Sequence, residues 1–247
     1  MTDFKELTSE TRSEHIANVL RDEILSGRFR EGERLPSERD LAVRFEGSRG
    51  AVREAFRLLE QLGLASIGPG GARVRAVEQA NIDIIGPLLM LNDVPDIDLV
   101  EQVLDVMGGL FKIALQQMIK RASDQELEAS RSLIQQLSDS SLSAEQQMQV
   151  RMEMGRFFMA KSHNLLLRLI NNSLRTQFVD REQSGVLPAT DPSEFAHPVA
   201  RLDAAIAARD IDSAVRASDE IAAIDRRIIL AAIAQAHPQQ DTAGATV

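Results

Sequence analysis

The chain of 247 residues contains no cysteine, no tryptophan and no tyrosine, so nine phenylalanines are its only aromatic side chains. The absence of cysteine excludes disulfide bonds, cysteine nucleophiles and thiolate zinc sites. Long apolar runs are missing too, because the longest, Ile84 to Leu91, is far below the roughly 18 residues of a membrane-spanning helix. The first ten residues are polar and unlike a signal peptide. We therefore expect a cytoplasmic protein that does not bind membranes.

Charge is unevenly distributed along the chain. The net charge of −9 argues at first against a nucleic-acid partner. Residues 1–77, however, carry 13 Lys and Arg against 13 Asp and Glu, whereas residues 78–247 carry 15 against 24 and hold the whole excess. Eight arginines and no lysine lie between positions 34 and 75: Arg34, Arg39, Arg44, Arg49, Arg53, Arg57, Arg73 and Arg75. Arginine pairs in two-point fashion with phosphate and guanine, so the first 77 residues favour contacts with nucleic acid.

Three helices and one β-hairpin are predicted in residues 1–77. Apolar spacing and turn residues place helices at about 10–25, after Ser37 and after Ser48, and strands at about 64–67 and 73–77. Ser37 and Asp40 form an S-x-x-D capping signal. The run Gly68-Pro69-Gly70-Gly71 joins the two strands. This order of elements predicts a winged helix-turn-helix.

The helix that begins after Ser48 has one apolar face and one arginine face. The apolar residues recur at helical spacing: Val52, Ala55, Phe56 and Leu59. Arg49, Arg53 and Arg57 recur every four residues on another face. Because the N-terminal residues of the second helix of a helix-turn-helix reach base edges, Arg49 and Arg53 are candidate DNA contacts. A solvated surface of mixed charge is the alternative that the charges alone would favour.

These residues resemble a known family. Leu35-Pro36-Ser37-Glu38-Arg39-Asp40-Leu41-Ala42, then Ser48-Arg49-x-x-Val52-Arg53-Glu54-Ala55, then Leu58-x-x-x-Leu62-Gly63-Leu64 is similar to the DNA-binding domain of GntR-type transcription regulators. The resemblance implies that Arg39, Arg49 and Arg53 contact operator bases and phosphates, and that Gly70 at the wing tip enters the minor groove. The full set of expected DNA-binding residues is Arg34, Ser37, Arg39, Ser48, Arg49, Arg53, Gly70 and Gly71.

Two departures from the family pattern stand out. Glu46-Gly47 replaces the usual Gly-Val before the capping serine, which implies a different turn geometry. Gly50 and Ala51 replace hydroxyl residues that would contact phosphate. Gly50 also costs the helix about 1 kcal/mol relative to alanine.

Residues 78–236 are predicted to form an all-helical domain for dimerisation and effector binding. Helices are expected at 97–121, 123–137, 144–161, 164–181, 194–209 and 211–236. Residues 183–192 are predicted to be a loop, and the polar tail 237–247 to be disordered. No strand alternation interrupts the helical pattern, so the chain as a whole is predicted to be mainly α.

A GntR-type head followed by such a domain resembles the FadR branch of the family, whose C-terminal domain is called FCD. Shorter stretches carry this resemblance: Asp98-x-x-Glu101, Ala122-Ser123-Asp124-x-Glu126-Leu127, Asn164-Leu165-Leu166 and Ala205-Ile206-x-x-x-Asp210. In many members an Asp and three His hold a divalent metal, and an Arg helps to bind a carboxylate effector. At the corresponding positions this chain has Arg151, Gly155 and, nearby, Val199 and Ile221, with Val103 near the place of the Arg.

No metal and no cofactor are expected, because a first-row metal ion needs several convergent nitrogen and oxygen donors. The four histidines are His15, His163, His197 and His237, and no two of them lie three or four residues apart. His197 lies two residues from the implied position, which turns it some 200° away on a helix. A shift of register across the proline-containing segment before it could still bring His197 to the site.

An apolar cavity with one cation is the predicted ligand site. Its expected lining is Val103, Met107, Arg151, Gly155, Val199 and Ile221. Such a cavity suits a carboxylate on a hydrophobic body. In the alternative these residues fill the core and Arg151 faces solvent. Gly108-Gly109 is interpreted as a bend or a close helix approach, and the seven internal methionines as adaptable core.

The resulting hypothesis is a transcription repressor that binds an inverted-repeat DNA operator as a homodimer. A small carboxylate or hydrophobic metabolite in the C-terminal domain would modulate it. The alternative is a regulator without a ligand, whose C-terminal domain only dimerises. An enzyme is not expected, because the sequence has no phosphate-binding loop and no His–carboxylate pair at motif spacing.

Overall fold

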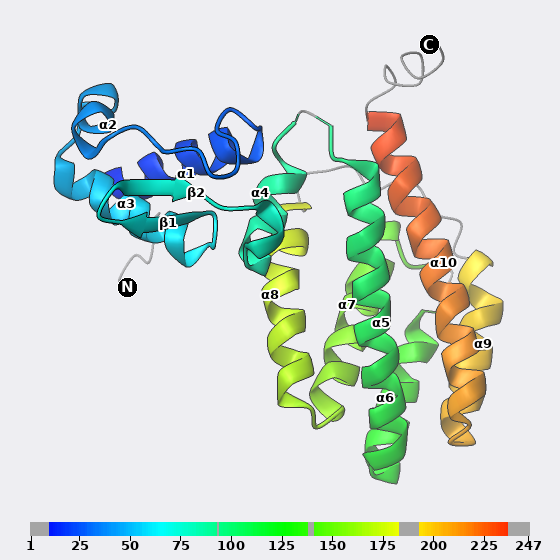
Figure 1. Cartoon of the computed structure of the whole chain (residues 1–247). Coiled ribbons are helices and arrows are strands. Elements are labelled where there is room, and N and C mark those ends of the chain that lie inside the picture. The colour runs from blue at the N-terminus through cyan, green and yellow to red at the C-terminus, as the bar shows by residue number, and fades with distance from the viewer. Residues whose placement is uncertain (1–9, 93, 138–140, 183–192, 237–247) are drawn as a thin grey trace, which may run out of the picture. The chain divides into compact units, whose positions relative to one another are not determined.

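The computed structural model describes residues 10–92, 94–137, 141–182 and 193–236. These residues form a mainly helical chain with one two-stranded sheet, as predicted (Figure 1). The chain divides into two compact units, Met1–Asp93 and Val94–Val247. Each unit has a hydrophobic core of its own. No helix in the described ranges is long and apolar enough to cross a membrane.

The first unit is a winged helix-turn-helix. Its main elements are α1 (Arg12–Leu25), α2 (Glu38–Arg44), α3 (Arg49–Gln61), β1 (Ala65–Gly68) and β2 (Gly71–Val74). The strands pair antiparallel, with Ala65 opposite Val74 and Gly68 opposite Gly71. The two outer glycines of the Gly-Pro-Gly-Gly run therefore belong to the strands, and Pro69-Gly70 alone makes the turn. The predicted architecture is confirmed, with strands shifted by one to three residues.

The core of this unit comes from the apolar stripes of its helices. Ile16 and Leu20 of α1 are fully buried, and α1 packs against α3. The predicted stripe of α3 is buried throughout: Val52, Ala55, Phe56 and Leu59. Burial of side chains of this size stabilises by about 1.5–3 kcal/mol each. The stripe therefore fixes which face of α3 is left for solvent.

The turn between α2 and α3 contains the departure from the family pattern. Glu46 has φ +48°, in the left-handed region that favours glycine. The Arg12 guanidinium donates to the backbone oxygens of Phe45 and Glu46, and the Gly47 amide donates to the Ala42 oxygen over 2.9 Å. A Cβ on Gly47 would lie 3.7 Å from Ile16 Cδ1, an ordinary contact. The turn is thus held by Arg12, although its glycine stands one position later than the family pattern has it.

The first compact unit extends beyond residue 77, the predicted end of the DNA-binding domain. Three short helices follow the wing: η1 (Val77–Gln79), η2 (Ile82–Ile84) and α4 (Ile85–Leu89). Ile84 is buried in the core of the first unit. The Asn81 side chain donates to the Gln61 oxygen over 2.9 Å, and the Asn81 amide donates to the Leu62 oxygen over 2.9 Å. These contacts with the end of α3 tie the segment after the wing to the first unit. The periodicity of apolar residues in the sequence does not reveal them.

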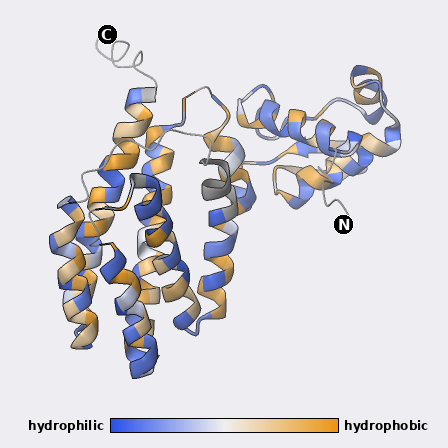
Figure 2. Ribbon diagram, turned by 180° about the vertical axis from the view of Figure 1, so that it is seen from behind, coloured by the Kyte–Doolittle hydropathy of each residue, from blue (hydrophilic) through white to orange (hydrophobic). Residues whose placement is uncertain are grey.

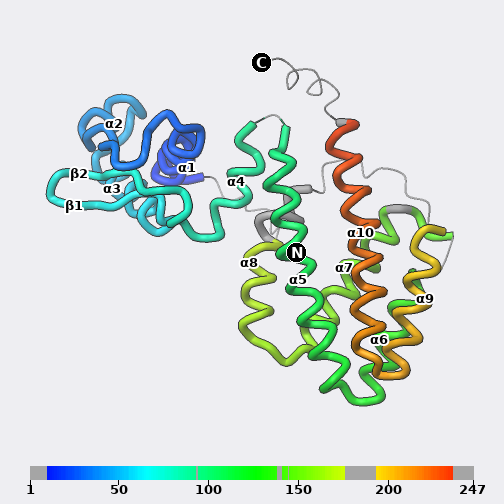
Figure 3. Tube along the Cα trace, turned by 45° about the vertical axis from the view of Figure 1, so that its right-hand side comes forward, coloured from blue at the N-terminus to red at the C-terminus, as the bar shows by residue number. Residues whose placement is uncertain are grey.

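The second unit is a bundle of helices. They are α5 (Ile97–Arg121), α6 (Asp124–Gln136), α7 (Ala144–Lys161), α8 (Leu165–Glu182), α9 (Ser193–Ala207) and α10 (Ile211–Ala236). The long helix α10 packs along α9 and α5, while α7 packs against α5 and α6 (Figure 3). Every predicted helix is confirmed to within two residues at each end. The predicted loop 183–192 and tail 237–247 lie outside the described residues.

Caps and apolar stripes account for where the bundle helices begin and how they pack. Ser123 and Glu126 form a capping box at the start of α6, and Ser143 and Gln146 form one at the start of α7. Polar and apolar residues alternate along the helices (Figure 2). The buried side chains of α5, α7, α9 and α10 meet in a single core cluster.

Candidate DNA-binding surface and ligand cavity

Two serines of the predicted DNA-binding set cap the helices of the helix-turn-helix. Ser37 Oγ accepts from the Asp40 amide over 3.2 Å and donates to an Asp40 carboxylate oxygen over 2.7 Å. Ser48 Oγ accepts from the Ala51 amide over 3.1 Å. Both serines are exposed. Each therefore has a structural role at a helix N-terminus, which is the end that favours anions such as phosphate.

Three predicted arginines, Arg39, Arg49 and Arg53, lie exposed around the start of α3, and one of them is held by a carboxylate. Arg53 Nε and Nη2 donate to the two oxygens of Glu38, over 3.2 and 3.1 Å. These bonds, and more weakly the charges of Arg53 and Arg49, hold the pKa of Glu38 below its ordinary value. Arg39 and Arg49 have no ion-pair or hydrogen-bond partner among the described residues. The structure thus brings Arg49 and Arg53 together around Glu38, a residue that the sequence analysis did not single out.

The wing places a further arginine over its glycines. Arg34 forms an isolated β-bridge with Arg73, beside the hairpin. Its Nη2 would lie only 2.5 Å from a Cβ on Gly70, so the guanidinium covers the turn. Gly71 has φ +100°, a backbone conformation that residues other than glycine rarely adopt. Arg34, Gly70 and Gly71 therefore form one exposed cationic tip.

Not every arginine of the first unit is free for DNA. Arg44 of α2 donates to both carboxylate oxygens of Glu23 over 2.8 and 2.5 Å, and Arg28 pairs with the same carboxylate. The bonds from Arg44 lower the pKa of Glu23, although its partial burial opposes them. Arg57 pairs with Glu54 one turn earlier on α3. Arg44 has a structural role, which its place in the arginine-rich stretch does not reveal.

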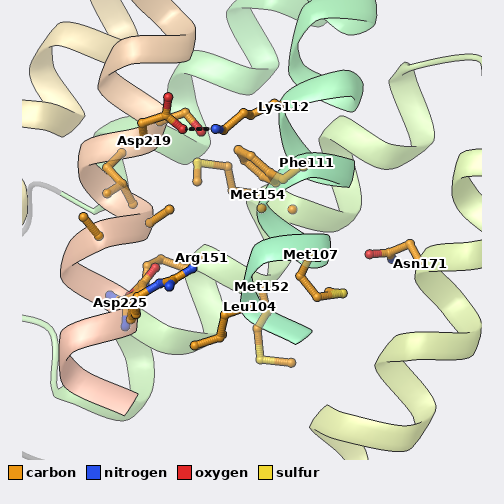
Figure 4. Close-up of a pocket in the computed structure, with 18 of the residues that line it drawn as sticks. Leu104, Met107, Phe111, Lys112, Arg151, Met152, Met154, Asn171, Asp219 and Asp225 are labelled. Atoms are coloured by element: carbon orange, nitrogen blue, oxygen red, sulfur yellow. Dashed lines mark ion pairs between the residues drawn. The ribbon is translucent and has the colours of Figure 1, made fainter. Parts of the chain in front are cut away.

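The bundle of the second unit contains a cavity of about 510 Å³ that is partly open to solvent (Figure 4). Small-molecule sites usually have volumes of about 300–1,000 Å³. Five of the methionines line the cavity: Met107, Met148, Met152, Met154 and Met159. Gly108 and Gly109 also line it, and a Cβ on either would meet no atom within 4 Å. The methionines thus belong both to the core, which contains Met118, Met154 and Met159, and to the cavity wall. The interpretation of the glycine pair as a close helix approach is wrong, because no described atom lies near either glycine's Cβ position.

The structure places four of the six predicted cavity residues on the wall: Met107, Arg151, Gly155 and Ile221. Val103 and Val199 do not line the cavity. Both are buried, and Val199 packs in the core cluster of the bundle. On α5 the adjacent Leu104 lines the cavity instead, since one residue turns a helix by about 100°.

Arg151 points inward, not to solvent, and its side chain is 8% exposed. Its guanidinium lies 4.7 Å from the centre of the Phe195 ring, and its Nε lies 3.2 Å from Asp225 Oδ1. Burial raises the pKa of Asp225 to about 6, against the opposing charge of Arg151. Asp225 and Phe195 lie far from Arg151 in the sequence, and no spacing pattern connects the three.

Other polar groups stand around the same cavity. Lys112 and Asp219 pair over 2.6 Å, with both side chains well exposed. In Figure 4 this pair lies apart from Arg151 and Asp225, and Asn171 of α8 faces Met107 of α5 across the space. The cavity is therefore mainly apolar, with one deeply buried cation.

The residues of the bundle do not fit the metal site that the FCD resemblance implies. The implied positions hold a guanidinium, a glycine and two aliphatic side chains, which do not make a donor set for a first-row ion. His197 is exposed on α9. Within the described ranges no three His, Asp or Glu side chains form a cluster that could hold a metal ion.

Comparison with known proteins identifies both units. The family model described as "Bacterial regulatory proteins, gntR family" matches residues 12–74. The model of the FCD domain matches residues 102–223. The first match covers the winged helix-turn-helix, and the second covers most of the helical bundle.

Individual relatives are similar over shorter stretches. The transcriptional regulator Mce2R of Mycobacterium tuberculosis is 35% identical over 101 residues, which are 40% of this chain and 42% of Mce2R. The transcriptional repressor NanR of Escherichia coli is 39% identical over 82 residues, 33% of this chain and 31% of NanR. The chain thus spans less than half the length of these relatives. The solved structure of Streptococcus agalactiae GntR is 19% identical, with a TM-score of 0.43 over 87% of this chain and 99% of that one.

The two family models, in the order of the two compact units, show that the chain belongs to the GntR family of bacterial regulatory proteins, with an FCD domain that fits the FadR branch.

Proposed function

We propose that the protein is a transcription regulator that binds operator DNA through α3 and the wing, and that a carboxylate ligand in the bundle changes its affinity for the operator. The observation that carries this proposal is the position of Arg49, which is exposed and unpaired among the described residues at the first position of α3. The capped N-terminus of this helix attracts phosphate, and its first residues are those that reach base edges.

Arg39, Arg53 and Arg34 extend this surface. The two-point bond with Glu38 fixes the plane of the Arg53 guanidinium before DNA arrives. A guanidinium ordered in advance loses less side-chain entropy on binding. Arg34 lies over Gly70 at the wing tip, and its guanidinium is placed to enter a minor groove there. Direct base contacts by such arginines contribute about 1–3 kcal/mol of discrimination each.

A homodimer on an inverted repeat is the assembly that this surface favours, because a helix-turn-helix reads two half-sites through two-fold symmetry. The bundle offers apolar surface for the second copy. Three leucines of α8 are each more than half exposed: Leu165, Leu166 and Leu169. Val106 and Ile113 of α5 are exposed as well. Apolar patches of this kind are typical of protein interfaces.

The ligand would occupy the cavity of the bundle, with its carboxylate on Arg151 and its apolar body among the methionines. Flexible thioether side chains adapt to the shape of a ligand. A ligand that binds better to one arrangement of the two DNA-binding units shifts the equilibrium toward it. Repression as the sign of the response is supported by NanR, which is named a repressor. The alternative, a regulator whose bundle only dimerises, predicts that no carboxylate changes operator affinity.

The test begins with selection of an operator from random double-stranded DNA by the full-length protein. Fluorescence anisotropy then compares wild type with Arg49→Ala and with Arg216→Ala, which removes an exposed arginine of α10. Arg49→Ala should weaken binding by about 1–3 kcal/mol, and Arg216→Ala should leave it unchanged. Equal affinity of wild type and Arg49→Ala would reject α3 as the recognition helix.

A further inference from the structure

Unpartnered polar atoms gather at the α7–α10 side of the cavity. Arg151 Nε and Asp225 Oδ1 lie 3.2 Å apart, yet their alignment does not make a hydrogen bond, and neither of these buried atoms has another partner in the described part of the chain. Gln147 stands one turn before Arg151 on the same face of α7. It is 1% exposed, and both polar atoms of its amide lack a partner. Buried polar atoms are nearly always hydrogen-bonded. Arg151 and Asp225 line the cavity, whereas Gln147 does not, so Arg151 Nε and Asp225 Oδ1 are the atoms suited to receive a polar ligand.

Arg151 has a second contact, with the Phe195 ring, whereas the negative charge of Asp225 is favoured by Arg151 alone. The Phe195 ring stacks with the guanidinium at 4.7 Å independently of Asp225. The carboxylate of Asp225 depends on Arg151 alone, because burial raises its pKa to about 6 and the charge of Arg151 is what opposes that rise. A stronger anionic partner for Arg151 would therefore leave the partly buried Asp225, whose Oδ1 is buried, without a compensating charge.

We propose that a carboxylate ligand replaces Asp225 as the partner of the Arg151 guanidinium, and that Asp225 takes up one proton from solvent in the same step. This inference rests on the proposed ligand-binding function of the cavity. Before binding, the cation faces one anion, Asp225. Afterwards it faces one anion, the ligand, and Asp225 is neutral. The only change of covalent bonds is the new O–H bond of Asp225, and the proton comes from the buffer.

Electrostatics favour this exchange over a complex in which the ligand and Asp225 both bind the Arg151 guanidinium as carboxylates. Two carboxylates on one buried guanidinium would repel each other, and like charges at close range raise the pKa of one partner strongly. A protonated Asp225 gains a donor that the ionised carboxylate lacks. It can then donate to the ligand carboxylate.

The remaining charges around α10 already have partners. Arg226 pairs with Asp105 and lies near Glu101 on α5, Arg227 pairs with Glu194 on α9, Arg201 of α9 pairs with Glu220, and Lys112 of α5 pairs with Asp219. Arg156 and Arg175 also line the cavity. Of all these groups Arg151 is the one whose charge acts on the pKa of Asp225. Asp225 is therefore the carboxylate expected to change protonation when an anion reaches Arg151.

Titration calorimetry of the full-length protein tests the exchange. Octanoate is the probe, and its binding enthalpy is measured at pH 7 in phosphate and in Tris, whose ionisation enthalpies differ. The difference should give an uptake of about 0.9 proton per octanoate, because a group with a pKa near 6 is about one-tenth protonated at pH 7. The affinity of the wild type should fall about tenfold per pH unit above pH 6.5.

Variants separate the exchange from simple binding. Asp225→Asn should bind octanoate with no proton uptake and no pH dependence, whereas Arg151→Met should lose at least tenfold in affinity. Asp203→Asn is the matched control, since Asp203 pairs with Arg131 outside the cavity, and it should keep the full proton uptake. Circular dichroism verifies that each variant is folded.

Octanoate binding without proton uptake, or uptake that persists in Asp225→Asn, would overturn the exchange and leave a ligand-binding cavity in place. If hexanoate, octanoate and decanoate all fail to bind between pH 5 and 8, the exchange is rejected together with the carboxylate ligand. The operator-binding test stands or fails independently of both results.

Discussion

Arg53 of α3 donates two hydrogen bonds to Glu38 of α2, over 3.2 and 3.1 Å, and so ties α3 to the helix before it. Both side chains are partly exposed, and exposed pairs of this kind contribute little to stability, about 0–1 kcal/mol. Glu38 therefore orients Arg53 and places one negative charge between Arg49 and Arg53, the two arginines of α3 that we propose to contact DNA.

Glu38→Gln should show whether Glu38 acts by orienting Arg53 or by its negative charge. We expect a change of less than about 1 kcal/mol in the free energy of unfolding. Affinity for scrambled DNA should rise, because a negative charge near phosphate is removed, while the preference for the selected operator over scrambled DNA falls. Anisotropy with both DNAs measures the ratio, and an unchanged ratio would show that Glu38 does not orient Arg53.

Gly63 after α3 should not tolerate a side chain. It has φ +78°, and a Cβ there would lie 2.8 Å from the Gln79 oxygen and 2.9 Å from Ala80 Cα, both of them backbone atoms. Gly63→Ala should therefore lower the free energy of unfolding by about 2–4 kcal/mol. Gly68→Ala is the control, since a Cβ there meets no atom within 4 Å. Chemical denaturation of both variants measures the difference, and equal stabilities would contradict the close approach.

The turn before α3 should gain stability if the family pattern is restored. Glu46→Gly relieves the left-handed conformation at φ +48°, and we expect a gain of about 0.5–1 kcal/mol. Gly47→Ala should be neutral or stabilising, because its Cβ would make an ordinary contact with Ile16 and the alanine restricts the unfolded chain. Thermal unfolding of the two variants tests this. A clear loss in both would mean that the turn is not as described.

The stability of the protein should carry a component from Asp225 that depends on pH. The folded pKa of about 6 lies above the ordinary value of 3.8, so the folded state binds the proton more tightly than the unfolded state. The resulting stabilisation is complete below about pH 4 and is lost as the pH rises to about 6. Relative to Asp225→Asn, the wild type should therefore lose about 1–3 kcal/mol over this window. Denaturation curves of both proteins from pH 4 to 7 measure the difference, and parallel curves would rule out the raised pKa.

Local chemistry made much of this fold predictable. Ser37, Ser48 and Ser123 cap helices where the capping pattern indicates, and the stripe from Val52 to Leu59 is buried as its spacing requires. Helix ends and buried faces depend on residues within one or two turns. The sequence can therefore specify them without knowledge of the tertiary structure.

The cavity was predictable only in part. The positions that the FCD resemblance implies brought Arg151 and Gly155 to the wall, but on α5 they pointed to Val103 instead of its neighbour Leu104, an error of one residue and about 100°. Asp225 joins Arg151 because α10 folds back on the bundle. That contact arises from tertiary packing, which no periodicity encodes.

The salt dependence of operator binding by the double variant Arg39→Ala/Arg49→Ala tests most directly whether α3 reads the DNA. If both arginines contact phosphates or bases, affinity should fall at every salt concentration. Each lost phosphate contact should also reduce the slope of log K against log salt by about 0.9. A double variant that binds the selected operator with the affinity and salt slope of the wild type would show that α3 does not read the DNA.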